Sequence, residues 1–149
     1  MLELLITVRH GAALPGNILS QSGIEDVKRT SEAIHRLISG RHFVILASPV
    51  GRAQQTASIL AARLGSTFET HDCLQESFNH REANKLTTEK GRAYQVVILV
   101  THQPGEEFPR EFWSGIKGFQ RHISSLPLET GQASYLDVRS GAFRYVEVE

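Results

Sequence analysis

Three short and almost uninterrupted apolar runs constrain the fold of this 149-residue chain more than any other feature. They are Leu2–Val8, Phe43–Ala47 and Val96–Thr101. Runs of this length without polar alternation are typical of strands that are buried on both faces, as in a parallel sheet. Because such strands need cover on both sides, the sequence predicts a central sheet between two layers of helices.

The segments between these runs have helical patterns. After the first run, apolar and small residues recur at helical spacing with charged residues between them, namely Ile24, Val27, Ser31, Ile34 and Ile38. Ser20 or Ser22 can cap this helix. Ser48-Pro49 is interpreted as the N-cap and first position of a second helix, which Gly65 can end.

The second half of the chain is less regular. Thr67–His71 is expected to form a short strand, and the polar stretch Asn79–Ala93 a loop with one or two helical turns. We expect a helix within Glu106–Ile123, after a loop. Aromatic side chains of this segment are expected to pack in the core, namely Phe108, Phe112, Trp113 and Phe119.

The C-terminal residues alternate between apolar and polar side chains. Gln132–Arg139 and Ala142–Val148 flank Ser140-Gly141, a pattern that is typical of a β-hairpin. No repeat or linker-like segment divides the chain. The elements together predict a single domain over residues 1–149, a three-layer α/β/α sandwich with a mostly parallel central sheet and a C-terminal hairpin.

The charge balance excludes some classes of partner. Lys and Arg (16) balance Asp and Glu (16), so no net field favours nucleic acid or an anionic membrane. The N-terminal residues lack the basic region of a signal peptide, and no apolar run reaches the roughly 20 residues that span a bilayer. Cys73 is the only cysteine, which excludes an internal disulfide. We therefore expect a soluble cytoplasmic protein, and the sequence indicates no oligomeric state.

Basic side chains follow each of the three predicted strands. Arg9 and His10 come at the end of the first, Arg52 lies shortly after the second, and His102 directly follows the third. The carboxyl ends of parallel strands meet at one edge of a sheet, where α/β proteins bind their ligands. We therefore expect these four side chains to form one pocket.

Such a pocket suits a phosphoryl group. Two guanidinium groups match phosphate oxygens with paired donors, and the start of a helix adds to the positive field near Arg52. Positive neighbours lower the pKa of a histidine, so that a neutral His10 can attack phosphorus and form a covalent phosphohistidine. Arg9, Arg52 and His102 would then stabilise the transferring group, and Gly11 would let the backbone turn closely around it.

The leaving oxygen also needs a proton. Glu76, in the segment Leu74-Gln75-Glu76, is the best candidate for the general acid and later for the base that activates water. Asp72, His80 and Glu82 are alternatives nearby in the sequence. No set of His, Cys and carboxylate residues has the spacing of metal ligands, so we expect chemistry without a metal or another cofactor.

The sequence resembles the histidine phosphatase superfamily, which is also called phosphoglycerate mutase-like. The matching motifs occur in family order over about two thirds of the chain: Val8–Gly11 (VRHG), Leu19–Gly23 (LSQSG), Ala47–Ala57 (ASPVGRAQQTA), Leu74–Glu76 (LQE) and Val100–His102 (VTH). This resemblance implies a phosphoglycerate mutase-like fold. It also implies that His10 is phosphorylated and that Arg9, Arg52 and His102 form the phosphate pocket.

The resemblance also bears on the substrate. Asn17 and Ser20 lie in a segment that often contributes a further phosphate contact, and the family's LTxxG is LSQSG here, which keeps a hydroxyl at Ser20. The chain lacks the insertions of the mutases and is similar in size to compact bacterial phosphohistidine phosphatases. Some of these lack an acid at the position of Glu76, whereas a glutamate there favours a phosphate ester.

Two substrate classes therefore stay open, a phosphorylated small molecule and a phosphohistidine protein. The expected activity is metal-independent hydrolysis through His10. A non-catalytic module that binds phosphate or phosphoprotein is the alternative. A phosphoglycerate-type mutase is a weaker alternative, because a mutase must hold its intermediate while the substrate reorients.

Overall fold

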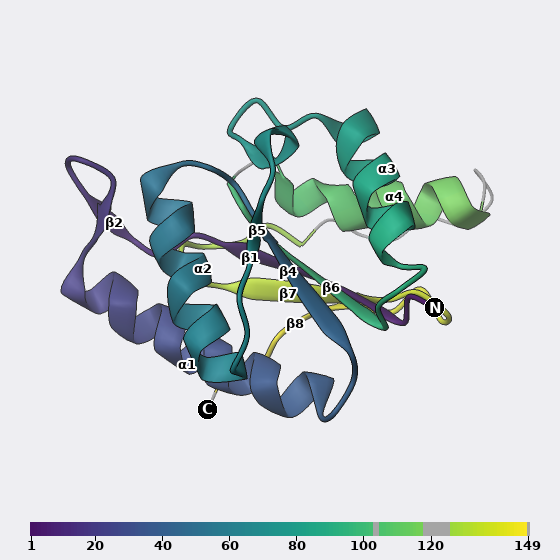
Figure 1. The fold of residues 1–149 in the computed structure, drawn as a ribbon, viewed down its shortest axis with the longest axis horizontal. Helices are drawn as coiled ribbons and strands as arrows, with labels where there is room; N and C mark the ends of the chain where they lie inside the picture. The colour runs from purple at the N-terminus through teal and green to yellow at the C-terminus, as the bar shows by residue number, and fades with distance from the viewer. Residues whose placement is uncertain (103–104, 118–125, 149) are drawn as a thin grey trace.

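The three apolar runs form neighbouring parallel strands at the centre of one sheet. In a computed structural model that describes residues 1–102, 105–117 and 126–148, they are β1 (Leu4–Arg9), β4 (Phe43–Ala47) and β6 (Val96–Thr101). β6 lies between the other two and is in register with both. Because the three strands run in the same direction, their carboxyl ends meet at one edge of the sheet (Figure 1).

Three further strands complete the sheet, whose order is β5-β4-β6-β1-β7-β8. β5 (Glu69–Thr70) is parallel to β4, whereas β7 (Ala133–Asp137) is antiparallel to β1 and pairs with β8 (Phe143–Tyr145). The turn between β7 and β8 contains Gly141 at φ +78°, a conformation that favours glycine. The mostly parallel sheet and the C-terminal hairpin are thus confirmed.

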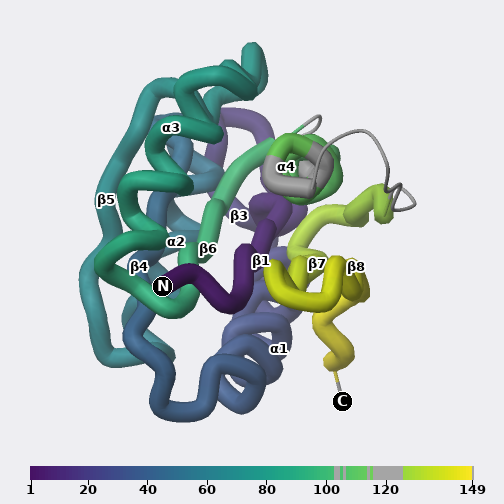
Figure 2. The backbone as a smooth tube through the Cα atoms, turned by 90° about the vertical axis from the view of Figure 1, so that its right-hand side faces the viewer, coloured from purple at the N-terminus to yellow at the C-terminus, as the bar shows by residue number. Residues whose placement is uncertain are grey.

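Helices cover both faces of the sheet. α1 (Gln21–Ile38) and α2 (Gly51–Leu64) lie on one face, and α3 (His80–Lys90) and α4 (Phe108–Lys117) lie on the other (Figure 1 and Figure 2). This arrangement confirms the predicted three-layer α/β/α sandwich.

Each central strand supplies side chains to two hydrophobic cores, because successive residues of a strand point to opposite faces. Ile6 and Ile98 pack with α1 and α2, and their neighbours Leu5 and Val97 pack with α3 and α4. Three aromatic side chains of α4 fill the second core as predicted: Phe108, Phe112 and Trp113. Phe119 lies outside the described residues.

The polar stretch Asn79–Ala93 contains a full helix, α3, where the sequence predicted only a loop with one or two turns. The side chain of Asn79 caps this helix by accepting a hydrogen bond from the backbone N–H of Glu82 (3.1 Å). Among the residues of α3, only Ala83 and Thr87 are buried. The apolar period of the segment is therefore too weak to reveal a helix.

The helix starts differ in how well the sequence predicted them. Ser20, one of two predicted caps, accepts a hydrogen bond from the backbone N–H three residues later and caps α1. α2 begins at Gly51 rather than at Pro49, and its N-cap residue Val50 makes no side-chain bond. The prediction of Ser48 as the cap of α2 was therefore wrong.

Two short strands, β2 (Ala13–Leu14) and β3 (Ile18–Leu19), form a small hairpin beyond β1 that was not predicted. Asn17 lies in its turn at φ +62°. The helix expected within Glu106–Ile123 is confirmed as α4, which follows the short 3₁₀ helix η2 (Gly105–Glu107). Residues 118–123 of the predicted segment lie outside the described residues.

Candidate active site

The strand order brings side chains from distant parts of the sequence to one edge of the sheet. Arg9 ends β1, His10 follows it, His102 follows β6, and Arg52 lies in the first turn of α2. The imidazole rings of His10 and His102 have centroids 5.0 Å apart. Nε of Arg52 lies 3.2 Å from Nε2 of His10. Both His102 and Arg52 are thus in contact distance of the His10 ring.

Two hydrogen bonds fix the orientation of the His10 ring. Nδ1 lies 2.8 Å from the carbonyl oxygen of Gly11, and because a carbonyl can only accept, Nδ1 carries the proton. Nε2 then holds a lone pair, which accepts a hydrogen bond from Arg52. The backbone N–H of His10 donates to Thr101 on the neighbouring strand (3.1 Å). Nε2 is therefore the ring atom of His10 that can act as a nucleophile.

The surroundings of His10 favour a neutral ring. The residue is 8% exposed, and this burial lowers the pKa of His10 below its ordinary value. The hydrogen bond to Gly11 opposes this effect, whereas the positive charges of Arg52 and Arg9 add to it. A neutral imidazole with a free lone pair is the form that can attack phosphorus.

His102 is a second neutral imidazole beside the first. The residue is 3% exposed. Burial, followed by repulsion from the His10 ring when that ring is protonated and then from the positive charge of Arg52, lowers the pKa of His102 to about 4. Nε2 of His102 lies 2.8 Å from the hydroxyl of Ser48, which directly follows β4. Nδ1 of His102 is buried and has no hydrogen-bond partner among the described residues.

The C-terminal part of the chain anchors Arg9. Nη1 of Arg9 donates to the carbonyl oxygen of Leu128 (2.7 Å), while its Nε is buried and has no partner in the parts of the chain that the structure describes. The backbone N–H of Gly131 donates to the carbonyl oxygens of both Arg9 (3.1 Å) and His10 (2.9 Å). Gly131 has φ +77°, a conformation that favours glycine. The segment before β7 therefore holds the backbone on which Arg9 and His10 lie.

Arg52 connects His10 to two more of the predicted site residues. Its Nη1 donates to the side-chain oxygen of Asn17 in the turn between β2 and β3. Its Nη2 pairs with the carboxylate of Glu76, in the loop after the 3₁₀ helix η1 (Asp72–Leu74). The Glu76 side chain is 61% exposed, so it can leave Arg52 without losing buried contacts. A phosphoryl group at His10 would take donors that Asn17 and Glu76 now occupy.

Gly11 and Ser20 lie next to these residues, but their polar groups are already bonded. The backbone N–H of Gly11 donates to Oγ1 of Thr56 (3.0 Å). A Cβ on Gly11 would come within 2.9 Å of a methyl group of Val27, so close packing against α1 explains this glycine. Oγ of Ser20 donates to the carbonyl oxygen of Ala12 (3.1 Å) in addition to capping α1.

Sequence reasoning missed two buried side chains that support the site. Ser48 contacts His102. Thr56 links Gly11 to α2, because its hydroxyl also donates to the carbonyl oxygen of Arg52 (2.8 Å). Ser48 directly follows a buried strand, a position that could have marked it. Thr56 lies inside a helical pattern and has no such signal.

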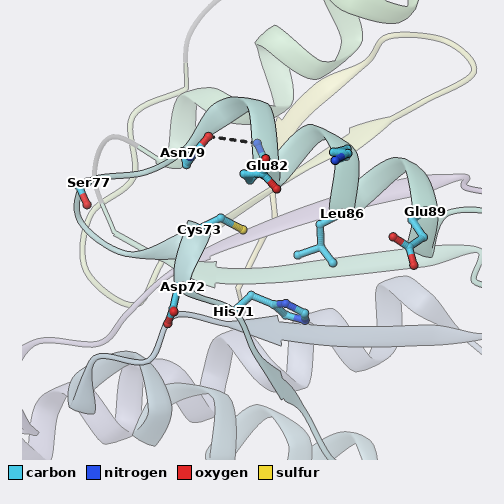
Figure 3. Close-up of a pocket in the computed structure, with 9 residues that line it drawn as sticks. His71, Asp72, Cys73, Ser77, Asn79, Glu82, Leu86 and Glu89 are labelled. Carbon is cyan, nitrogen blue, oxygen red and sulfur yellow. Dashed lines mark hydrogen bonds between the residues drawn. The ribbon is translucent and has the colours of Figure 1, made fainter.

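A cavity of about 580 Å³ lies between η1 and α3 (Figure 3). Ser77 and Asn79 line it, so it adjoins the loop that carries Glu76. Burial raises the pKa of the Cys73 thiol in its wall, which disfavours a reactive thiolate.

In the described parts of the chain, no group of three or more His, Cys, Asp or Glu side chains could hold a metal ion. None of the described helices is both long and apolar enough to cross a membrane.

Solved structures share this fold. The structure of the protein histidine phosphatase SixA complexed with tungstate matches with a TM-score of 0.71 and 18% identity, over 95% of this chain and 93% of that one. A mycobacterial glucosyl-3-phosphoglycerate phosphatase matches with a TM-score of 0.63 and 14% identity, over 98% and 97%. A Plasmodium falciparum phosphoglycerate mutase matches with a TM-score of 0.59 and 16% identity, over 97% and 88%.

Comparison of the sequence with curated proteins gives no match. A family model described as "Histidine phosphatase superfamily (branch 1)" matches residues 5–125, a range that contains His10, Arg52 and His102. The matched range covers most of the chain and contains the candidate site residues from Arg9 to His102. The protein therefore belongs to the histidine phosphatase superfamily.

Proposed function

We propose that the protein is a metal-independent phosphatase that hydrolyses a phosphate monoester or a phosphohistidine through a covalent intermediate on His10. The observation that carries this proposal is the buried, neutral His10 ring, whose Nε2 lone pair meets the guanidinium group of Arg52. Arg9 and His102 each offer a buried polar atom that no described residue bonds. An oxyanion bound at His10 would supply the missing acceptors.

In the first half-reaction, Nε2 of His10 attacks phosphorus, and the bond between phosphorus and the leaving group breaks. Glu76, in its protonated form after it has left Arg52, donates that proton to the leaving oxygen of an ester and becomes a carboxylate. Arg9, Arg52 and His102 donate hydrogen bonds to the non-bridging oxygens as their charge redistributes. The Nδ1–H bond of His10 to a backbone carbonyl stabilises the positive charge that the phosphorylated ring carries.

In the second half-reaction, a water molecule attacks the phosphorus atom of the phosphohistidine. The Glu76 carboxylate takes a proton from this water, so the residue returns to its starting role as an acid. The bond between phosphorus and nitrogen breaks, and its electron pair returns to Nε2 of His10. Inorganic phosphate then leaves, and Arg52 can bond Nε2 again.

Two observations support different substrate classes. The SixA structure to which the fold is similar is that of a protein histidine phosphatase, which favours a phosphohistidine protein. Glu76 lies at Arg52, where an acid would assist a phosphate ester, whose leaving oxygen needs a proton. Both classes belong in the first substrate screen. A module that only binds phosphate needs no imidazole with an unprotonated ring nitrogen. The neutral His10 ring therefore favours a phosphatase over a binding module.

The first experiment is hydrolysis of para-nitrophenyl phosphate, with EDTA present, by the wild type and by His10→Ala. The variant should lose on the order of 1,000-fold or more in kcat while its melting temperature stays close to that of the wild type. His35→Ala is the control, because His35 lies exposed on α1. Equal turnover by His10→Ala and the wild type would refute the proposed nucleophile.

A further inference from the structure

Ser48 makes a contact that the mechanism above does not use. It directly follows β4, is fully buried, and places its hydroxyl 2.8 Å from Nε2 of His102. The two residues are 54 positions apart in sequence. They meet because β4 and β6 are neighbours in the sheet and end at the same edge.

The hydrogen-bond partners of Ser48 determine which way this bond runs. The backbone N–H of Val50 donates to Oγ of Ser48 (3.3 Å), so the oxygen already accepts one bond. The hydroxyl proton needs an acceptor, and in the described part of the chain Nε2 of His102 is the acceptor within reach. A buried hydroxyl proton is rarely left unpaired. Ser48 therefore donates to Nε2 of His102, and the proton of the neutral ring lies on Nδ1.

The two histidines are thus held in opposite tautomers. In His10, the carbonyl of Gly11 holds the proton on Nδ1 and leaves the lone pair on Nε2, where Arg52 donates. In His102, Nε2 is the bonded acceptor, and the Nδ1–H is buried with no partner in residues 1–102, 105–117 and 126–148. A lone pair facing an arriving phosphoryl oxygen would repel it, whereas an N–H attracts it.

We propose that Ser48 is a positioning residue that keeps His102 as a neutral donor, whose Nδ1–H binds an oxygen of the transferring phosphoryl group. This proposal rests on the proposed function for its phosphoryl group, but the tautomer itself is a property of the free protein. Ser48 touches no reacting atom and acts through His102. Without it, nothing in the described contacts would prevent the His102 proton from lying on Nε2.

The tautomer is measured directly by ¹⁵N NMR of the imidazole rings at pH 7.5, without substrate. The wild type should show protonated Nδ1 and unprotonated Nε2 at His102. In Ser48→Ala the proton should move wholly or partly to Nε2, and Ser48→Thr should restore the wild-type pattern because it keeps the hydroxyl. Ser134→Ala is the matched control, since Ser134 is equally buried and its hydroxyl has no partner. A protonated Nε2 in the wild type would overturn the proposal.

Two further measurements test the role of this tautomer. Titration with tungstate should shift the Nδ1–H resonance of His102 in the wild type, and an unchanged resonance with bound tungstate would overturn the role as donor. With para-nitrophenyl phosphate, Ser48→Ala should lose at least about tenfold in kcat with a smaller change in KM, and Ser48→Thr should recover activity. If the wild type binds tungstate through Nδ1–H but hydrolyses nothing, the proposed function fails and the role of Ser48 in anion binding stands.

Discussion

Nε of Arg52 donates a hydrogen bond to Nε2 of His10 over 3.2 Å, so the guanidinium group covers the atom that we propose as the nucleophile. The same guanidinium group bonds Asn17 and Glu76. In the free protein all three of its nitrogen positions are therefore occupied. A phosphoryl group that bonds to Nε2 of His10 takes the lone pair to which Arg52 now donates, and the exposed carboxylate of Glu76 is the acceptor of Arg52 that can most readily move into water.

We predict that Arg52→Lys loses most of its activity although it keeps a positive charge. A lysine ammonium lacks the planar set of donors that bonds several acceptors at once and that matches two phosphate oxygens. With para-nitrophenyl phosphate, kcat/KM should fall on the order of 100-fold. Arg63→Lys is the matched control, because Arg63 lies in the same helix and its pairing with Glu32 is exposed. Wild-type activity in Arg52→Lys would show that charge alone is sufficient.

Oxyanions should stabilise the folded protein. An anion that binds only the folded state adds about 2.7 kcal/mol to the free energy of unfolding at 100 times its Kd. Tungstate or phosphate should therefore raise Tm in a thermal unfolding experiment, and the rise should shrink in Arg52→Ala. Potassium chloride at equal ionic strength is the control. If chloride raises Tm as much as tungstate does, the effect is one of ionic strength and the anion site is not as described.

Stability should decrease in mild acid because His102 is buried as a neutral ring. Its pKa falls from the ordinary 6.5 to about 4 through burial, then through His10 and Arg52, with Arg9 adding to the shift and Glu76 opposing it. Between these two pH values the unfolded chain binds a proton that the folded protein does not. The free energy of unfolding therefore decreases as the pH falls from 6.5 to about 4, by at most about 3 kcal/mol, and is unaffected by this group above 6.5.

Urea unfolding at a series of pH values measures this dependence. In His102→Asn the free energy of unfolding should depend less steeply on pH between 6.5 and 4. His35→Ala should keep the wild-type slope, because His35 is exposed on α1. The same slope in His102→Asn and in the wild type would assign the acid sensitivity to other groups.

The central sheet was predictable from sequence because strands that are buried on both faces form short, uninterrupted apolar runs. The run Val96–Thr101 matches β6 residue for residue, and Phe43–Ala47 matches β4. The sequence of α3 contains no comparable apolar pattern. Its buried face contains Ala83 and Thr87, which give little hydrophobic contrast, and its start depends on the cap at Asn79. A helix that packs through small residues resembles a polar loop in sequence.

In the candidate site too, residues marked by their local sequence were predictable, whereas contacts between residues far apart in the sequence were not. Arg9, His10 and His102 directly follow predicted strands, so the topology of a parallel sheet was enough to group them. Ser48 was assigned to a helix start because Ser-Pro is common there, yet its hydroxyl bonds His102. This contact depends on which strands are neighbours in the sheet, and a local sequence pattern does not give that order. The catalytic roles of Arg9, His10 and His102 stay predictions.

We predict that Glu76→Gln separates the two substrate classes. A glutamine cannot give or take the proton that the alkoxide leaving group of an alkyl ester requires, so hydrolysis of glycerol 2-phosphate should fall by about 100-fold or more. A phosphohistidine peptide has a better leaving group, so it should lose only the part that comes from water activation, a step that both substrates share, and its loss should be smaller. Stability should change by less than about 1 kcal/mol, because the ion pair of Glu76 with Arg52 is exposed on the carboxylate side. An equal loss with both substrates would assign Glu76 to the water-activating step alone and contradict its role as the acid for the leaving group.

We predict that alanine at Gly23, in the first turn of α1, destabilises the protein. A Cβ at this position would lie 2.2 Å from the carbonyl oxygen of Ala12 and 2.9 Å from its backbone nitrogen. Backbone atoms cannot move aside as a flexible side chain can, so Gly23→Ala should destabilise the protein by about 3 kcal/mol or more. Because Ala12 follows the His10-Gly11 pair, the shift should also reduce activity in the fraction that remains folded.

Gly115→Ala is the matched control for this substitution. Gly115 is exposed in α4, and a Cβ there would meet no atom within 4 Å. Alanine is favoured over glycine inside a helix by about 1 kcal/mol, so this variant should be as stable as the wild type or more stable. If urea unfolds Gly23→Ala at the same concentration as the wild type, α1 must be able to move away from Ala12. The glycine of the LSQSG motif would then have to be explained by something other than this close approach.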